Sequence, residues 1–164
     1  MKKKISFVIT IVSGIFADIV SKWYVFSQPD RFKKITIIPG FLNIIQSENK
    51  GIVFGMFPGK ANIFILLSLL AIAAILFIYI KSDKNIFSSN VALGLILAGA
   101  IGNLWDRIWF KCVRDFIDLH LGEKYHWPTF NVADGLICVG ISLMVFASFS
   151  PSKHKNQGNR LFCR

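Results

Sequence analysis

The chain has 164 residues, enough for one domain, and 54% of them are hydrophobic while only 17% are charged. Its mean hydropathy is +0.55. Soluble domains of ordinary composition have about 25% charged residues. The composition therefore indicates a membrane protein and excludes an ordinary soluble enzyme.

The net charge is +10, from 19 Lys and Arg against 9 Asp and Glu. An excess of positive charge can indicate nucleic-acid binding when the basic residues gather in one patch. Here they are scattered through loops and tails, which suits anionic lipid headgroups better. We therefore expect membrane lipids, and no nucleic acid, among the partners.

Cysteines and histidines give no sign of a metal or redox site. Cys112, Cys138 and Cys163 form no Cys-x-x-Cys pair, and an odd number cannot all pair within the chain. Their roles stay open. The histidines lack zinc-site spacing with cysteine or carboxylate. We predict that the protein uses no metal and no cofactor.

The first segment, Lys2–Lys4 followed by ISFVITIVSGIF, is typical of a secretory signal peptide. However, the apolar run has no small-x-small cleavage site and continues through Asp18 and Lys22. We predict a first transmembrane helix at about residues 5–26. Its 22 residues are enough to span about 30 Å of hydrocarbon.

A polar segment, residues 27–61, follows. ITII at Ile35–Ile38 and FLNIIQ at Phe41–Gln46 are short and rich in β-branched residues, and Pro39-Gly40 between them is a turn pair. They predict a small strand pair. The rest of the segment is rich in glycine, so we expect either a β-like platform or an irregular lid over a site.

Three more apolar segments predict helices at about residues 62–80, 91–110 and 130–149. A short inner loop, residues 81–90, joins the first two, and a second outer segment, 111–129, joins the last two. A basic tail, 151–164, follows. The predicted fold class is therefore membrane all-α. It has four transmembrane helices and a small extracytoplasmic β-like platform after the first, in one membrane domain of residues 1–150.

Four spans place both termini on the same side. Lys2–Lys4, Lys81, Lys84 and the basic tail then lie together, and the positive-inside rule makes that side cytoplasmic. Cations such as Arg31 and Lys124 also occur in the outer segments. The short inner loop and the dense N-terminal cluster nevertheless favour this topology.

The carboxylates favour the same topology, because all except Asp83 fall in outer segments or at the outer ends of helices. From the helical rise, Asp18 lies about 20 Å up the first helix and Asn103 about 18 Å up the third. Asp134 lies near the outer start of the fourth. We expect the three to meet in one layer near the outer interface.

Two groups of polar residues lie on single helix faces. Asp18 and Lys22, at i and i+4, predict a structural ion pair. Asn103, Asp106 and Arg107 are at i, i+3 and i+4. Asp106 and Arg107 could form a second ion pair, or Arg107 could bind a substrate carbonyl or a lipid phosphate. An amide such as Asn103 needs partners from a neighbouring helix or a substrate.

Asp115 and Asp134 are the candidate catalytic pair. Asn131 fits the role of helix cap, and Asp134 fits it less well. Two carboxylates in one desolvated site can share a single proton. The ionised member can then activate water, and the protonated member can protonate a leaving group. A carboxylate proton relay in a transporter would use the same residues. The residues alone leave both readings open.

Five motifs then resemble the lipoprotein signal peptidase family, also called signal peptidase II. They are DIVSKW at 18–23, NKGIVFG at 49–55, AGAIGNLWDR at 98–107, VRDFID at 113–118 and FNVAD at 130–134. The resemblance covers essentially residues 5–150. Val53 and Ala98 replace the Ala and Gly that the family often has, and MFPGKAN leaves little room for its usual short amphipathic helix.

The resemblance implies a membrane-embedded aspartyl endopeptidase with Asp115 and Asp134 as catalytic residues. It implies supporting or substrate-binding roles for the other motif residues, namely Asn103, Arg107, Asn131, Asn49, Gly51, Gly55, Asp18 and Lys22. The resemblance also implies a structural role for Asp106, which belongs to the motif at 98–107.

The implied reaction removes the signal peptide from diacylglyceryl-modified prolipoproteins, just before the lipidated Cys. The implied setting is the bacterial cytoplasmic (inner) membrane, with a monomer whose site faces outward. The alternative class is a small four-helix transporter or assembly factor, whose carboxylates should lie near the midplane of the bilayer.

Overall fold

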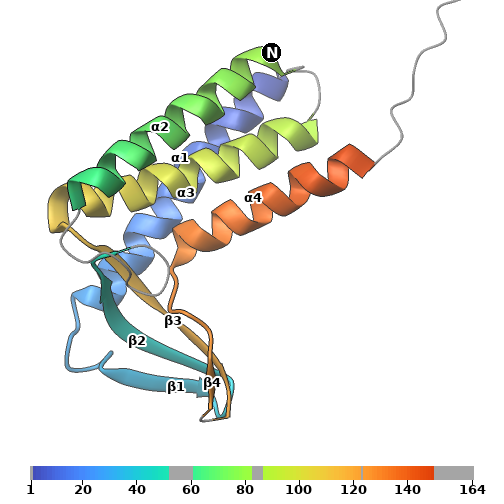
Figure 1. The fold of residues 1–164 in the computed structure, drawn as a ribbon. Helices are drawn as coiled ribbons and strands as arrows, with labels where there is room; N and C mark the ends of the chain where they lie inside the picture. Colours follow the sequence, from blue (N-terminus) through green and yellow to red (C-terminus); the bar gives the residue numbers. More distant parts are fainter. Residues whose placement is uncertain (1, 52–60, 83–86, 123, 150–164) are drawn as a thin grey trace, which may run out of the picture.

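The computed structural model describes residues 2–51, 61–82, 87–122 and 124–149. It is a bundle of apolar helices with a small antiparallel sheet at one end (Figure 1), as the sequence predicted in outline. The helices are α1 Lys2–Phe26, α2 Ala61–Lys81, α3 Phe87–Phe110 and α4 Val132–Phe149, and the strands are β1 Lys34–Ile38, β2 Leu42–Asn49, β3 Val113–Leu121 and β4 Tyr125–His126.

Helix α3 is the centre of the bundle and contacts each of the other helices. Phe7 from α1 packs with Leu93 and Leu97 from α3 in the main apolar core. The Phe7 ring also stacks on Tyr79 of α2, with ring centroids 3.7 Å apart. Three helices are thereby joined at the end of the bundle away from the sheet (Figure 1).

The outer surface of the bundle is apolar, while charged side chains lie inside it. Val8, Phe16, Leu70, Phe77 and Phe146 are all exposed. Three segments are long and apolar enough to cross a membrane, and α4 contributes a shorter apolar stretch; these are Ile5–Phe26, Asn62–Lys81, Phe87–Phe110 and Val132–Ala147. An apolar exterior around buried charge is the pattern expected of a protein whose surroundings are lipid.

The sheet has the strand order β1-β2-β3-β4, with antiparallel neighbours. The predicted strand pair is confirmed as β1 and β2. The turn between them uses Gly40 at φ 74°, a left-handed conformation that glycine adopts without a steric penalty.

The sheet is larger than the platform predicted after the first helix. Half of the sheet, β3 and β4, comes from the segment at 111–129. The physical reason is the pairing of β3 with β2, in which Asn43 lies opposite Asp118 and Asn49 opposite Val113. Both outer segments therefore form one sheet beside the helix ends (Figure 1).

The helices begin or end a few residues away from their predicted boundaries. Helix α3 begins at Phe87 rather than 91. Helix α4 begins at Val132 rather than 130, because Phe130 forms a β-bridge with Ile117. Gly55, Val53 and most of MFPGKAN lie outside the described residues.

The contact between α3 and α4 depends on a close backbone approach at Gly99. A Cβ atom at this position would overlap the carbonyl oxygen of Ala133 and would lie 2.7 Å from a side-chain carbon of Ile137. Neither helix could then keep its position. Gly135 on α4 is different, since a Cβ there would meet no described atom within 4 Å.

We predict that Gly99→Ala lowers stability while Gly135→Ala does not. Overpacking should cost Gly99→Ala about 1–3 kcal/mol, whereas Gly135→Ala should gain up to about 1 kcal/mol from helix propensity. Thermal unfolding of the purified protein in detergent micelles measures both. Equal midpoints for the two variants would contradict the close approach.

Candidate active site

A cluster of buried charges lies where the bundle meets the sheet. Lys22, whose side chain is 0% exposed, places its Nζ atom 2.8 Å from Oδ2 of Asp18 and 3.2 Å from Oδ2 of Asp106. This confirms the predicted Asp18–Lys22 ion pair. The suggested Asp106–Arg107 pair is not what forms, because among the described residues Asp106 pairs with Lys22 and Arg114.

Arg114 reaches Asp106 because the chain reverses between α3 and β3. Lys111, at φ 58°, takes the left-handed conformation that commonly ends a helix. Arg114 then donates to Asp106 through its backbone N at 3.0 Å, its Nε at 3.2 Å and its Nη2 at 2.8 Å. Two cations therefore face two carboxylates, which compensates charges that would be costly to bury alone.

Lys22 also fixes the orientation of Asn103. The Asn103 Oδ1 atom accepts hydrogen bonds from Lys22 Nζ at 3.3 Å and from Asn131 Nδ2 at 3.2 Å. The amide nitrogen of Asn103 therefore faces Asp134, and donates to its Oδ1 at 2.8 Å. The buried lysine thus determines which group Asp134 meets.

Asn131 connects the two candidate catalytic carboxylates. Its Nδ2 donates to Oδ1 of Asp115 at 2.6 Å. Its Oδ1 accepts from the backbone N of Asp134 at 3.0 Å, while Oδ2 of Asp134 accepts from the backbone N of Asn131 at 3.2 Å. This reciprocal pair is a capping box. The prediction that Asn131 caps the helix is confirmed. Asp134 also takes part in the cap, although the sequence predicts that it fits this role less well.

Asp18 holds the same helix start from another element. Its Oδ1 accepts from the backbone N of Ala133 at 2.9 Å. Helix α4 therefore begins on side chains from α1 and from its own first turn, which satisfy N–H groups that have no partner inside the helix. The predicted meeting of Asp18, Asn103 and Asp134 in one layer is confirmed by these contacts.

Asp115 lies in β3 with 1% of its surface exposed. Its Oδ2 accepts from Asn49 Nδ2 at 3.2 Å. The side chain of Asn49 is itself held by the backbone N of Gly51, which donates to its Oδ1 at 3.1 Å. Asn49 therefore orients Asp115, and the backbone of Gly51 orients Asn49.

Burial raises the pKa of Asp115, and the negative charge of Asp134 raises it further; hydrogen bonds from Asn49 and Asn131 and the charge of Lys22 act the other way. The result is a pKa of about 7. Because this value is near neutral pH, the carboxyl pair can hold a proton under conditions in which an exposed aspartate would not.

Arg107 is the cation beside the pair. It lies one helical turn beyond Asn103 and donates from Nη1 to the backbone oxygen of that residue at 3.3 Å. Its charge interacts with Asp134 and Asp115. The guanidinium is half-buried, so it can attract a polar ligand group towards the carboxylates.

Cys112 is a poor nucleophile here. It is buried, and burial raises the pKa of its thiol, with the charges of Glu48 and Asp106 adding to the effect. A thiol that stays protonated does not attack a carbonyl. Cys138 is exposed on α4.

Asp118, His120 and His126 form a second polar cluster and are the described residues whose atoms could hold a metal ion. Burial acts to raise the pKa of Asp118, but hydrogen bonds from Asn43 and His126 and the charges of the histidines outweigh it and leave that pKa below its usual value. These three residues could not be grouped from the sequence alone, because β4 was not predicted.

A family model described as Signal peptidase (SPase) II matches residues 10–150. The chain belongs to the signal peptidase II family. The match contains the whole network of Asp18, Asn103, Asp115, Asn131 and Asp134, and it confirms the resemblance drawn from the motifs.

Relatives from this family align along most of the chain. The lipoprotein signal peptidase of Syntrophus aciditrophicus (strain SB) is 38% identical over 162 residues, which cover 95% of this chain and 100% of the relative. That of Clostridium novyi (strain NT) is 36% identical over 140 residues, which cover 85% and 95%.

Two solved structures share the fold. One is a bacterial membrane enzyme determined by the in meso method at 2.3 Å resolution, with a TM-score of 0.78 and 29% identity over 94% of this chain and 93% of the other. A second, determined at 1.9 Å, gives a TM-score of 0.75 and 30% identity over 89% and 94%. This member of the signal peptidase II family is therefore a bacterial membrane enzyme of the aspartic peptidase type. The transporter or assembly-factor alternative is not favoured.

We predict a pH-dependent stability difference between the natural protein and Asp115→Asn. A pKa that rises from 3.8 to about 7 on folding changes the free energy of unfolding by at most about 4 kcal/mol between low and high pH. The folded state binds this proton more tightly, so stability falls as pH rises from about 4 to about 7 and levels off above.

Asp115→Asn removes the titrating group and should remove this slope. Unfolding midpoints of both proteins in detergent, measured at intervals between about pH 4.5 and 8, test the prediction. Parallel curves across that interval would contradict the raised pKa.

Proposed function

We propose that Asp115 and Asp134 are the catalytic carboxylates of an endopeptidase that removes the signal peptide from diacylglyceryl-modified prolipoproteins, just before the lipidated Cys. The observation that carries the proposal is the pair's connection through Asn131, with Asp115 raised to a pKa of about 7. Two carboxyl groups that share a proton are the acid and base that peptide hydrolysis requires.

In the proposed reaction, the ionised carboxylate removes a proton from water, and the water oxygen attacks the scissile carbonyl carbon. The protonated carboxyl donates to the carbonyl oxygen as the tetrahedral intermediate forms. The carbon–nitrogen bond then breaks, and the leaving nitrogen takes a proton from the pair. The raised pKa favours Asp115 as the member that begins protonated.

The neighbouring residues would support this exchange. Asn131 and Asn49 donate to Asp115, and Asn103 donates to Asp134, so each carboxylate keeps its orientation while the proton moves. Arg107, whose charge acts on both, would bind the substrate backbone. None of these steps calls for a metal or cofactor.

We further propose that the sheet lies at the outer face of the bacterial inner membrane. The first residues of α1, the last of α2 and the first of α3 lie at the end of the bundle opposite the sheet (Figure 1). The cations of that end, Lys2–Lys4 and Lys81, would be cytoplasmic under the positive-inside rule. Residues 1–150 would form one membrane domain with a cytoplasmic basic tail.

A hollow beside the sheet is our candidate site for part of the substrate's lipid. It has a volume of about 450 Å³ and is lined by Trp23, Phe26 and Phe110 with Glu48 and Arg114 among its polar residues. Aromatic walls near charged groups suit the boundary between acyl chains and headgroups. Arg114 adjoins Asp115 in β3, so a lipid held here would lie near the scissile bond.

We predict that Asp115→Asn and Asp134→Asn each lower cleavage of a lipidated precursor by at least about 100-fold, because each removes one partner of the acid–base exchange. Single-turnover cleavage followed by gel shift measures the loss. Asp30→Asn, which removes an exposed carboxylate from the first outer segment, is the matched control and should cleave normally. Full cleavage by either dyad variant would refute the assignment.

We also predict that a precursor without the diacylglyceryl group is cleaved much more slowly than the lipidated one.

If the hollow holds part of the lipid, Trp23→Ala should weaken this preference by raising KM for the lipidated precursor. Trp127→Ala is the control, since Trp127 is similarly exposed, at 69% against 65%, but lies beyond β4. Equal turnover of both precursors by the natural protein would refute the lipid requirement.

A further inference from the structure

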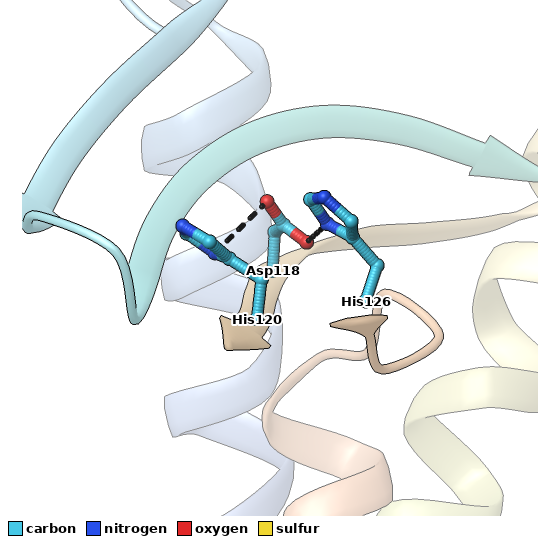
Figure 2. A group of neighbouring side chains, drawn as sticks. All are labelled: Asp118, His120 and His126. Atoms are coloured by element: carbon cyan, nitrogen blue, oxygen red, sulfur yellow. Dashed lines mark hydrogen bonds and ion pairs between the residues drawn. The ribbon is translucent and has the colours of Figure 1, made fainter. Parts of the chain in front are cut away.

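The second polar cluster lies on the two strands that the sequence did not predict. Asp118 and His120 are in β3, and His126 in β4 is paired directly opposite His120. The two imidazole rings stack with centroids 5.1 Å apart and planes 15° from parallel. Figure 2 shows the Asp118 carboxylate between them, facing a ring nitrogen of each.

The donor atoms are close enough to converge on one ion. Oδ1 of Asp118 is 3.1 Å from Nδ1 of His126, and Oδ2 is 3.7 Å from Nδ1 of His120. One ligand atom from each residue lies within 4.8 Å of the others. Donors that share a tetrahedral zinc ion lie roughly 3.4 Å apart, so ring rotations that move a donor atom by up to about 1.4 Å would close the site.

We propose that Asp118, His120 and His126 form a binding site for one divalent transition-metal cation of the zinc class, which ties β3 to β4. Two imidazoles and one carboxylate are a donor set suited to such ions rather than to Ca²⁺ or Mg²⁺. A fourth position would be left to water.

Asn43 orients the Asp118 carboxylate for metal binding. It lies opposite Asp118 in the β2–β3 register and is 1% exposed. Its Nδ2 donates to Oδ2 of Asp118 at 2.9 Å, which fixes the carboxylate plane and leaves Oδ1 directed at His126. A buried partner that orients a ligand is a regular feature of metal sites.

The exposure of the three ligands provides an entry path. The side chains of Asp118 and His120 are 8% and 9% exposed, while that of His126 is 51% exposed. Two ligands are therefore held in the sheet and one can rotate at the surface. A cation can enter from solvent and be enclosed by His126.

This site is separate from the carboxylate pair. The hydrogen-bond and ion-pair partners of Asp118 are Asn43, His120 and His126. The hydrogen-bond partners of Asp115 are Asn49 and Asn131, which take no part in the cluster. The cation would stabilise the strand that carries Asp115 without entering the reaction.

The experiment uses the full chain without a polyhistidine tag, stripped with chelator and exchanged into micelles. We expect ZnCl₂ to bind with one-to-one stoichiometry by calorimetry and to raise the unfolding midpoint by at least about 3 °C at saturation. Co²⁺ should bind at the same site and give the visible absorption of a four-coordinate complex. Absence of one-to-one binding would mean that the cluster is only a hydrogen-bonded network, and would overturn the proposal.

His126→Gln is the test variant, because its exposed side chain can be replaced without disturbing the core. It should lower Zn²⁺ affinity at least about tenfold and abolish the thermal shift. His154→Gln, in the C-terminal tail, is the matched control and should bind as the natural protein does. Both variants should keep the natural circular dichroism spectrum and cleavage of the lipidated precursor. Undiminished binding by His126→Gln would overturn the site, and leaves the catalytic assignment untouched.

Discussion

The interaction on which the rest of this structure depends is the burial of Lys22 between Asp18 and Asp106. A lysine 0% exposed in an apolar bundle is stable only if its charge is compensated. Arg114 completes the balance from the sheet. Because these four residues come from α1, α3 and β3, neutralising one charge also fixes how the bundle and the sheet are placed.

The same lysine sets the orientation of a series of hydrogen-bonded side-chain amides. Lys22 donates to the oxygen of Asn103, so the nitrogen of Asn103 faces Asp134. Asn131 then links Asp134 to Asp115. Each carboxylate receives hydrogen bonds that orient it, while burial keeps the pKa of Asp115 near 7. The structural charges are thus adjacent to the proposed catalytic pair, in which burial of Asp115 favours its protonated form.

Helix starts and close contacts bring this network to the end of the bundle. Gly99 permits α3 and α4 to approach, and Asp18 and Asn131 cap the first turn of α4. The sheet adds Asp115 from β3. Further along the same strand, Asp118 and its partner Asn43 belong to a second polar group. Strand β3 therefore contributes side chains to two separate polar groups.

The sequence by itself determined the apolar helices, the β1–β2 pair and the layer in which Asp18, Asn103 and Asp134 meet, because hydropathy, turn residues and helical rise are local properties. The motifs identified the family. Only the tertiary structure decided that Asp106 pairs with Lys22 and Arg114, that Asp134 shares in capping α4, and that His120 and His126 meet. These contacts depend on the chain reversal after α3 and on the pairing of β3 with its neighbours, and such long-range register is not encoded in any single segment.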